Sequence, residues 1–270
     1  MMKEAVRRLS WRVGRRLYCL ARGDGTNDPR RNGEYWLVDH VIQNAPAGGV
    51  LLDVGANVGE WTGRALETIG SRSDRFRIHA FEPCAGTFEI LRRRFASEGS
   101  VEAHAMAVSS SNGEALFYSG GAGLGTNSLD PISGSAHAHV PLTTLDTFVS
   151  GAGIERVLML KIDVEGFDLG VMQGASTLLA RGNVDVLQFE YNWRWLRTRT
   201  SLLDVFELIK GYPYRFGKLA GDHVAFYDAW HFELDRYFEN NYVLVRKGCA
   251  LEACGRSFRF DSSNVAVRVA

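Results

Sequence analysis

A short apolar run at 49–54 ends in a turn whose residue types suit the binding of a small molecule. Asp53 lies in the run, and Gly55, Asn57 and Gly59 follow it. Glycines at such a turn let backbone amides approach a ligand that a side chain would exclude. The spacing is G-x-x-x-G, which is neither the G-x-G-x-x-G of a dinucleotide site nor a P-loop with its lysine. The turn therefore predicts a ligand site that is not built around a string of phosphates.

Glu82 closes the next apolar run, 77–82. An acid at this position in nucleoside-binding sheets accepts hydrogen bonds from the two hydroxyls of a ribose. A ribose without a pyrophosphate indicates S-adenosylmethionine, and Asp53 would either meet its ammonium group or brace the amides of the turn. The alternative is a plain glycine turn with a solvent-facing Glu82, but the coincidence of three features at one sheet edge favours the cofactor site.

Three charged residues, Lys161, Asp163 and Glu165, alternate around the end of the most apolar run, 157–163. Charged side chains are rarely buried without partners, so this position indicates function. A sulfonium methyl group is already activated, whereas a hydroxyl acceptor must be aligned and must lose one proton. Asp163 or Glu165 would be the base. Structural roles remain open: Lys161 would pair with Glu190 on a neighbouring strand, and Asp163 would cap the following helix.

A metal ion offers a second route to the same chemistry. Glu190 lies at the end of the run 184–191 and Asn192 follows it, so both would converge with Asp163 as oxygen ligands for Mg²⁺ or a similar hard cation. Such an ion would lower the pKa of the acceptor hydroxyl. Only coordination geometry establishes a site of this kind, so the sequence leaves the divalent cation open.

The segment 191–201 interleaves tryptophans with arginines and is the expected acceptor-binding site. Its candidate residues are Trp193, Arg194, Trp195 and Arg197. Flat indole rings suit sugar rings, and guanidinium groups suit carboxylate or phosphate. The alternative is a solvated arginine loop anchored by core tryptophans. The stretch is too short to indicate nucleic acid.

The segment 119–140 is rich in glycine and serine and longer than an ordinary connection, which favours a mobile lid or acceptor loop. His137 and His139 lie in it, and an H-x-H on a polar loop is usually surface. His223 is a better candidate for a catalytic base, although no partner for it is visible in the sequence.

Strand-like runs alternate with helical patterns along the chain. The predicted strands are 49–54, 77–82, 101–108, 114–119, 157–163 and 184–191, with later ones near 214–218 and 241–247. The predicted helices follow 54 and also cover 86–96, 167–180 and a Ser201-capped segment at 201–210. This order predicts an α/β fold with a mostly parallel sheet, helices on both faces, and ligands at the carboxyl ends of the strands.

Composition limits the partners. The chain has 270 residues, enough for one α/β domain, and its 31 basic and 31 acidic residues give no reason to expect nucleic acid. We expect a small-molecule hydroxyl acceptor, and the sequence leaves oligomerisation open. Four cysteines without paired spacing, the lack of a signal-peptide pattern and the lack of a transmembrane run favour the cytoplasm.

Residues 5–20 form an amphipathic pattern in which aliphatic residues recur at helical spacing among arginines. Such a basic helix could lie on an anionic membrane or bind an acidic partner. We expect instead that it packs on its own domain. Turn residues then follow in "ARGDGTNDPRRNG", so residues 1–32 are taken as a helix and linker, 33–248 as the cofactor domain and 249–270 as a tail.

Four blocks together resemble the FkbM family of S-adenosylmethionine-dependent methyltransferases. They are "LLDVGANVGEWT" at 51–62, "PLTTLDTFV" at 141–149, "LKIDVEGFDLGVMQGA" at 160–175 and "VLQFEY" at 186–191. The resemblance covers about 50–245. It implies a Rossmann-like seven-stranded sheet with the last strand antiparallel, and a cofactor-binding role for Asp53, Gly55, Asn57, Gly59 and Glu82. It also implies methyl transfer, commonly to a hydroxyl of a sugar or natural product, without naming the acceptor.

We therefore expect an S-adenosylmethionine-dependent O-methyltransferase acting on a saccharide or glycosylated secondary metabolite. A nicotinamide-dependent oxidoreductase would share the α/β sheet but lacks its fingerprint here. A noncatalytic module that binds the cofactor is the other alternative, because fold does not fix function.

Overall fold

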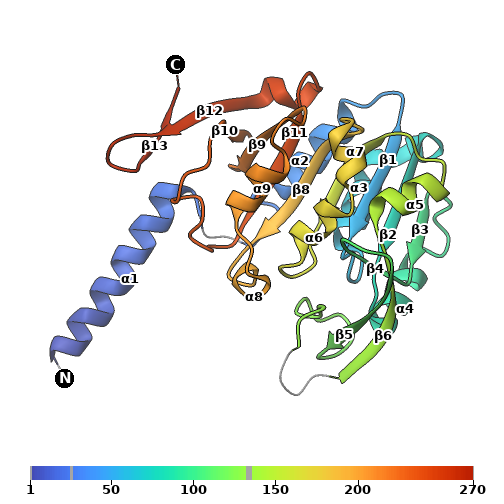
Figure 1. The fold of residues 1–270 in the computed structure, drawn as a ribbon, viewed down its shortest axis with the longest axis horizontal. Coiled ribbons are helices and arrows are strands. Elements are labelled where there is room, and N and C mark those ends of the chain that lie inside the picture. Colours follow the sequence, from blue (N-terminus) through green and yellow to red (C-terminus); the bar gives the residue numbers. More distant parts are fainter. Residues whose placement is uncertain (1, 25–26, 132–135, 270) are drawn as a thin grey trace.

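In the computed structural model, which describes residues 2–24, 27–131 and 136–269, ten strands form one mixed sheet (Figure 1). Their spatial order is β13-β12-β10-β9-β11-β8-β7-β1-β2-β3. Their bounds are β1 Gly49–Val54, β2 Phe76–Phe81, β3 Val101–His104, β7 Val157–Ile162, β8 Val184–Tyr191, β9 Tyr214–Leu219, β10 Val224–Tyr227, β11 Asn240–Arg246, β12 Gly255–Phe260 and β13 Ala266–Arg268. The predicted α/β class is confirmed.

The sheet is larger than the seven strands that we expected. β3, β2, β1, β7 and β8 run parallel, and β11 is antiparallel to both of its neighbours, β8 and β9. Beyond β9, the strands β10, β12 and β13 continue the sheet. The residues that we expected to form a tail after 248 supply two of these strands. The added strands cover an edge that would otherwise expose unpaired backbone groups.

Helices cover both faces because neighbouring strand residues point to opposite sides. Leu51, Met159 and Val186 lie in register and pack against α2 and α3, whereas the adjacent residues of each strand pack against α5, α6, α7 and α9. The helix bounds are α2 Glu34–Gln43, α3 Glu60–Ile69, η1 Gly70–Arg75, α4 Ala85–Arg94, α5 Leu145–Gly151, α6 Asp168–Gln173, α7 Ser176–Ala180, α8 Trp195–Thr198, α9 Leu202–Leu208 and η2 Ala250–Cys254. Ser201 caps α9, as predicted, through a reciprocal box with Asp204.

A small second sheet was not predicted. It has the order β4-β6-β5, with β4 at Ala107–Val108, β5 at Gly113–Ser119 and β6 at Ala136–Thr143. The predicted strand 101–108 is therefore divided between two sheets, and 114–119 pairs with β6 instead of joining the main sheet. The segment predicted as a lid includes the start of β6, and its residues 132–135 lie outside the described residues.

The predicted N-terminal helix is present as α1, Met2–Arg22, but its expected packing on the domain is wrong. It extends away from the sheet (Figure 1), and its apolar residues between Val6 and Leu20 are exposed. Its last turns hold it to the body, where Tyr18 donates a hydrogen bond to Glu233 and Arg22 pairs with the same carboxylate. Among the described residues, no helix has both the length and the apolar character needed to cross a membrane.

Candidate active site

The turn between β1 and α3 lies directly against the end of β7. Gly55 has a φ of 80°, and a Cβ atom there would lie 1.9 Å from the carbonyl oxygen of Asp163. Asn57 and Gly59 also have positive φ, at 49° and 82°. The amide of Gly55 donates to the carbonyl of Phe81 on β2 at 3.1 Å. The close approach of three strands thus requires the glycine at 55.

Glu82 closes the same corner from the end of β2. Its Oε2 accepts the amide of Asn57 at 3.0 Å, and its Oε1 accepts the amide of Cys84 at 2.8 Å. Burial raises the pKa of Glu82 to about 7, although these two hydrogen bonds act in the opposite direction. Each carboxylate oxygen has a further lone pair, so both could also accept a hydroxyl hydrogen. Glu82 thus lies directly after β2 and beside the glycine turn, as the sequence predicts.

Asp53 supports the turn from below and does not line the cavity. Its Oδ2 accepts the Thr62 hydroxyl of α3 at 2.7 Å, and its Oδ1 lies 3.6 Å from the ammonium of Lys161. The side chain is fully buried, and burial raises its pKa. Two roles were predicted for Asp53: contact with the ammonium group of the ligand, and support of the turn. Because Asp53 is buried beneath the cavity, the first role is wrong. Asp53 joins α3 to β7 and in this way braces the turn.

Lys161 connects three carboxylates beneath the site. Its ammonium donates to Asp163 at 3.1 Å and also faces Asp53 and Glu34. Burial alone would lower the pKa of Lys161, but these three negative charges raise it. A lysine held in the charged form is not a base, so its role is to position Asp163. Glu34, which the sequence analysis missed, begins α2 and accepts a hydrogen bond from Gln188 at 2.7 Å.

Asp163 and Glu190 share a hydrogen bond across the ends of β7 and β8. Burial, the charge of Asp163 and this bond raise the pKa of Glu190 well above its usual range. Burial acts in the same direction on Asp163, but the Lys161 ammonium and the bonds from Glu190 and Lys161 together lower its pKa. The shared proton therefore resides on Glu190, and Asp163 is ionised. Glu190 also accepts an N–H from the side chain of Asn192 at 3.1 Å.

Glu165 stands apart from this network. Its backbone has a φ of 57°, an uncommon conformation outside glycine, which turns the residue out of the strand direction. Burial and the nearby charge of Asp163 raise the pKa of Glu165 to about 7, and the Arg194 guanidinium, 2.8 Å away, partly offsets them. A carboxylate with a pKa near neutrality suits a general base.

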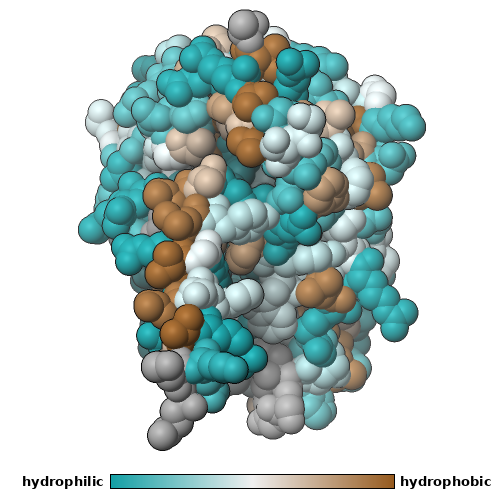
Figure 2. Space-filling model, turned by 90° about the vertical axis from the view of Figure 1, so that its left-hand side faces the viewer, coloured by the Kyte–Doolittle hydropathy of each residue, from teal (hydrophilic) through white to brown (hydrophobic). Residues whose placement is uncertain are grey.

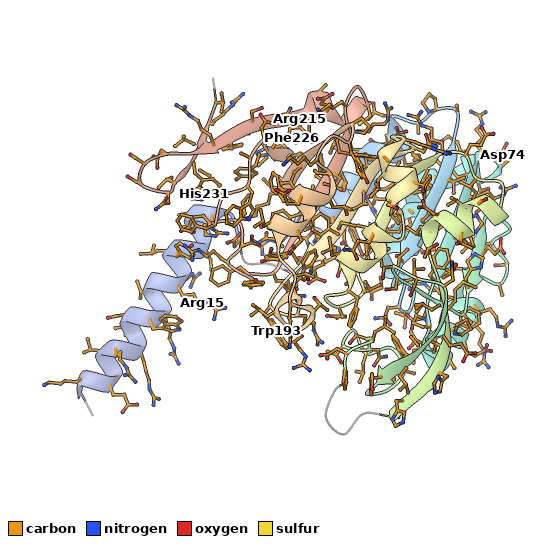
Figure 3. The ribbon with its side chains drawn as sticks, viewed as in Figure 1. Arg15, Asp74, Trp193, Arg215, Phe226 and His231 are labelled. Atoms are coloured by element: carbon orange, nitrogen blue, oxygen red, sulfur yellow. The ribbon has the colours of Figure 1, made fainter. Side chains whose placement is uncertain are left out.

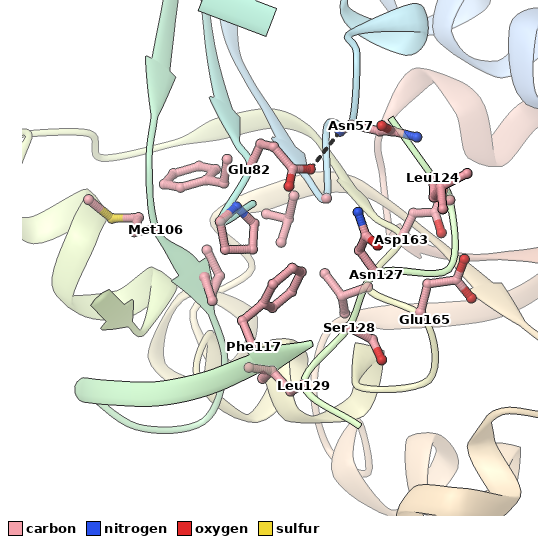
Figure 4. A pocket seen from close by; sticks show the side chains of 18 of the residues that line it. Asn57, Glu82, Met106, Phe117, Leu124, Asn127, Ser128, Leu129, Asp163 and Glu165 are labelled. Atoms are coloured by element: carbon pink, nitrogen blue, oxygen red, sulfur yellow. Dashed lines mark hydrogen bonds between the residues drawn. The ribbon is translucent and has the colours of Figure 1, made fainter. Parts of the chain in front are cut away.

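These groups open into one cavity (Figure 4). Glu82, Asp163, Glu165 and Glu190 line it, and among the described lining residues they are the charged ones. The opposite wall comes from the small sheet and from the segment that follows β5. Its residues include Phe117, Leu124, Asn127, Ser128 and Leu129, none of which the sequence analysis named. For the residues after β5, the signal was the length and composition of 119–140, whereas Phe117 lies in the predicted strand 114–119.

A family model described as the methyltransferase FkbM domain matches residues 53–216. This match includes the glycine turn, Glu82 and the acidic residues at the ends of β7 and β8. The chain belongs to the FkbM methyltransferase family. The predicted resemblance is thus confirmed, and the oxidoreductase alternative is no longer supported.

One curated relative of this FkbM-family chain is the hexuronic acid methyltransferase AglP of Haloferax volcanii, 25% identical over 157 residues. The match covers 58% of this chain and 62% of that protein, which is less than two thirds of the relative's length. Solved structures with some likeness include a methyltransferase FkbM from Methylobacillus flagellatus KT, at 17% identity and a TM-score of 0.47, covering 73% of this chain and 44% of that chain. Another is precorrin-6y C5,15-methyltransferase from Geobacter metallireducens, at 9% identity and a TM-score of 0.40, covering 79% and 87%.

Of the residues predicted to bind the acceptor, one lies in the core of this FkbM-family structure and the others lie nearer its surface. Trp195 is fully buried and donates its indole N–H to the carbonyl of Glu190 at 3.0 Å, so its predicted contact with substrate is wrong. Trp193 is 57% exposed at the lower edge of the molecule (Figure 3), with the Arg194 guanidinium 5.2 Å from its ring. Arg197 makes two hydrogen bonds to Asp130 and ties α8 to the segment before β6.

The histidines predicted as alternatives lie elsewhere. His223 sits in the turn between β9 and β10, where its Nδ1 lies 2.9 Å from Asp222, and it does not line the cavity. It is therefore not the base. His137 and His139 are exposed on β6, as expected for surface residues.

The predicted metal ligands do not converge as a set of three. Asn192 accepts the amide of Arg194 with its side-chain oxygen and donates to Glu190 with its nitrogen, so only Asp163 and Glu190 face the cavity. In the described part of the chain, three side chains of the types that bind metals do lie close together elsewhere. They are His79, Glu102 and His104, on β2 and β3. The two imidazoles lie 3.1 Å apart there, and burial lowers the pKa of each.

Proposed function

We propose that this FkbM-family protein is an S-adenosylmethionine-dependent O-methyltransferase whose acceptor is a hydroxyl of a saccharide or a glycosylated secondary metabolite. The observation that carries the proposal is the acidic cavity, in which Glu82, Asp163 and Glu165 face the same space as the glycine turn. S-adenosylmethionine brings two cationic groups, its sulfonium and its ammonium. A cavity lined by carboxylates favours such a ligand over an anionic one.

The residues of the turn fit this cofactor. Gly55 and Asn57 of the turn line the cavity together with Glu82, so a nucleoside in the cavity would lie against the turn. Glu82 would hold the ribose, because both of its oxygens remain able to accept hydroxyl hydrogens. When bound, the cofactor supplies an activated methyl group.

We assign the role of base to Glu165. With S-adenosylmethionine bound, its methyl group would pass from sulfur to the acceptor oxygen, with S-adenosylhomocysteine as the leaving group. The hydroxyl proton passes to Glu165, whose pKa of about 7 allows it to be ionised at neutral pH. Asp163, held ionised by Lys161 and Glu190, would orient the acceptor and favour the cationic donor. Asp163 already has hydrogen-bond partners in Lys161 and Glu190. The proposed mechanism therefore needs no divalent cation.

The class of acceptor rests on two supports. The name of the relative AglP specifies a hexuronic acid, a carboxylated sugar. In this chain the exposed indole of Trp193 and the adjacent guanidinium of Arg194 would offer a stacking face and a donor to such a ring. Both residues follow β8, and Arg194 contacts Glu165, which lines the cavity.

Two measurements test the proposal. Calorimetry should show binding of S-adenosylmethionine and no binding of NADH. A methyl-transfer screen over neutral and acidic sugars should then find an acceptor, in the presence and absence of a chelator. Cofactor binding without transfer to any acceptor would favour the noncatalytic module. Activity lost on chelation and restored by Mg²⁺ would assign a metal to Asp163 and Glu190.

We also propose that the catalytic unit spans 33–248 and works in the cytoplasm. All four cysteines are free, which suits a reducing compartment. Expression of residues 33–248 alone tests these boundaries. This fragment lacks β12 and β13, so we expect it to be less stable than the full chain.

A further inference from the structure

The helix α1 has one apolar stripe that nothing in the described structure covers. Val6, Leu9, Val13, Leu17 and Leu20 recur three or four residues apart, so they share one side of the helix. They are between 49% and 75% exposed. In Figure 2, which views the molecule from the side of α1, hydrophobic residues form a continuous column along it. A row of five exposed aliphatic side chains indicates a binding surface.

The stripe faces away from the rest of the protein. Arg15, Tyr18 and Arg22 occupy the opposite line of the helix, and these residues make the contacts with the body. Arg15 lies 5.8 Å from the ring of Phe238, Tyr18 donates to Glu233, and Arg22 pairs with Glu233 (Figure 3). Lys218 of β9 also donates to the carbonyl of Arg22 at 2.9 Å, which satisfies a terminal group of the helix. The orientation of α1 is thus fixed at its C-terminal end.

The charge of α1 identifies the kind of surface that would cover the stripe. Its basic residues are Lys3, Arg7, Arg8, Arg12, Arg15, Arg16 and Arg22, and its single acid is Glu4, which pairs with Arg8. A second copy of α1 would bring like charges together. A bilayer that contains anionic lipids offers both an apolar layer for the aliphatic stripe and phosphates for the arginines on its flanks.

We propose that α1 lies in the interface of an anionic membrane, with the Val6–Leu20 stripe in the acyl boundary and the arginines at the headgroups. This inference does not depend on the methyl-transfer reaction. α1 would then hold the catalytic domain at the membrane surface through the contacts of Tyr18 and Arg22.

Vesicle sedimentation with the full chain tests the proposal. At low salt, the protein should bind vesicles of phosphatidylcholine with phosphatidylglycerol and bind pure phosphatidylcholine much less, and raised salt should weaken binding. The double change Leu9→Glu and Leu17→Glu should lower binding on the order of tenfold or more, because the stripe no longer favours an apolar layer. Trp11→Gln is the matched control, since Trp11 is 70% exposed but lies on the line of Arg15 and Tyr18.

A second pair of variants tests the charge. Arg12→Gln with Arg16→Gln should weaken binding to anionic vesicles, and Arg12→Lys with Arg16→Lys should retain it. If the wild type binds S-adenosylmethionine, unchanged binding shows that each variant is folded. If it does not, circular dichroism tests the folding of each variant. The proposal is overturned if the wild type does not prefer anionic vesicles, or if Trp11→Gln loses as much binding as the leucine pair. A dimer that Leu9→Glu and Leu17→Glu dissociate would show that a second copy covers the stripe instead.

Discussion

Under the proposed function, the cavity has a donor side, made of Gly55, Asn57, Glu82 and Asp163, and an acceptor side, made of Phe117, Leu124, Gly125, Asn127, Ser128 and Leu129. On the donor side, three strands of the main sheet approach so closely that one position excludes any Cβ atom. Backbone amides hold Glu82 from two directions. This side has little freedom to change without disturbing the sheet.

The acceptor side is held mainly by its own local contacts. Tyr118 and Ser128 pair through their backbones, and Asn127 accepts the amide of Gly120 at 3.0 Å. Its bonds to the rest of the domain include one from the amide of Gly123 to the Thr87 hydroxyl at 2.9 Å and two from Arg197 to Asp130. Such a segment can exchange side chains without altering the main sheet. If the proposed function holds, one side would fix the reaction and the other would select the acceptor.

The largest effect is expected for Gly55→Ala. A left-handed backbone costs a non-glycine residue about 1–2 kcal/mol, and the 1.9 Å contact with the carbonyl of Asp163 forces a backbone shift in addition. We expect cofactor binding to be lost and the unfolding temperature to fall, as measured by calorimetry. Gly153→Ala is the control, because Gly153 has a φ of 66° but no atom near its Cβ position. Equal losses in the two variants would show that the contact is unimportant.

Glu165→Gln removes the proposed base while keeping the shape of the side chain. We expect kcat to fall by about 10²- to 10⁴-fold, with the affinity for S-adenosylmethionine close to that of the wild type. Glu114→Gln, an exposed change on β5, is the matched control. Methyl-transfer kinetics and a cofactor titration separate the two quantities. A variant that keeps its kcat would transfer the role of base to Asp163.

The donor side was predictable from the sequence because its constraints are local. β1 and β8 have the bounds predicted for them, 49–54 and 184–191, since each is a strand-length run rich in apolar residues. A glycine that must avoid a Cβ contact and an acid at a strand end are visible in the residue types themselves. Glu34 carries no such signal, because its place beside Lys161 depends on where α2 packs.

The wrong predictions concern how elements pack against one another. The periodicity of a sequence shows which face of an element is apolar but not which surface covers that face. The helical pattern of α1 identified an apolar stripe, but whether the domain or another surface covers it depends on the path of the chain after Arg22. Tryptophan often stacks on sugar rings, but Trp195 lies in the core, where its indole donates a hydrogen bond to the carbonyl of Glu190. β5 was predicted as a strand, but the small sheet was missed because its partner β6 is largely exposed and lacks a continuous apolar run.

Glu82→Ala should weaken the donor side and also lower stability, because the amides of Asn57 and Cys84 lose their acceptor. The free energy of S-adenosylmethionine binding should weaken by about 1–3 kcal/mol, because the ribose hydroxyls lose their acceptors. Glu82→Gln should weaken it less, since one acceptor oxygen remains. Calorimetric titration measures both variants. Wild-type affinity in the alanine variant would remove Glu82 from the cofactor site.

Affinity for the cofactor should also depend on pH. The pKa of Glu82 is raised to about 7 in the free protein, and hydroxyl donors favour the ionised carboxylate, so binding lowers this pKa and releases a proton. The affinity should therefore be constant above about pH 8 and fall by up to about tenfold per pH unit below 7. Titrations from pH 5.5 to 8.5 measure the slope. Glu82→Gln should flatten it, whereas a slope lost only in Glu165→Gln would assign it to Glu165.

The smallest effect is expected for Leu124→Ala, which tests whether the two sides are separable. Leu124 lines the cavity but is 48% exposed, so its loss costs the fold little. An acceptor that covers this side chain should lose part of the apolar contact, raising its KM by about threefold to tenfold. The affinity for S-adenosylmethionine should not change, because the contacts of the turn and Glu82 are all on the donor side. If the cofactor affinity falls as far as the acceptor's, residues 124–129 also hold the cofactor, and the division of the cavity into two sides is wrong.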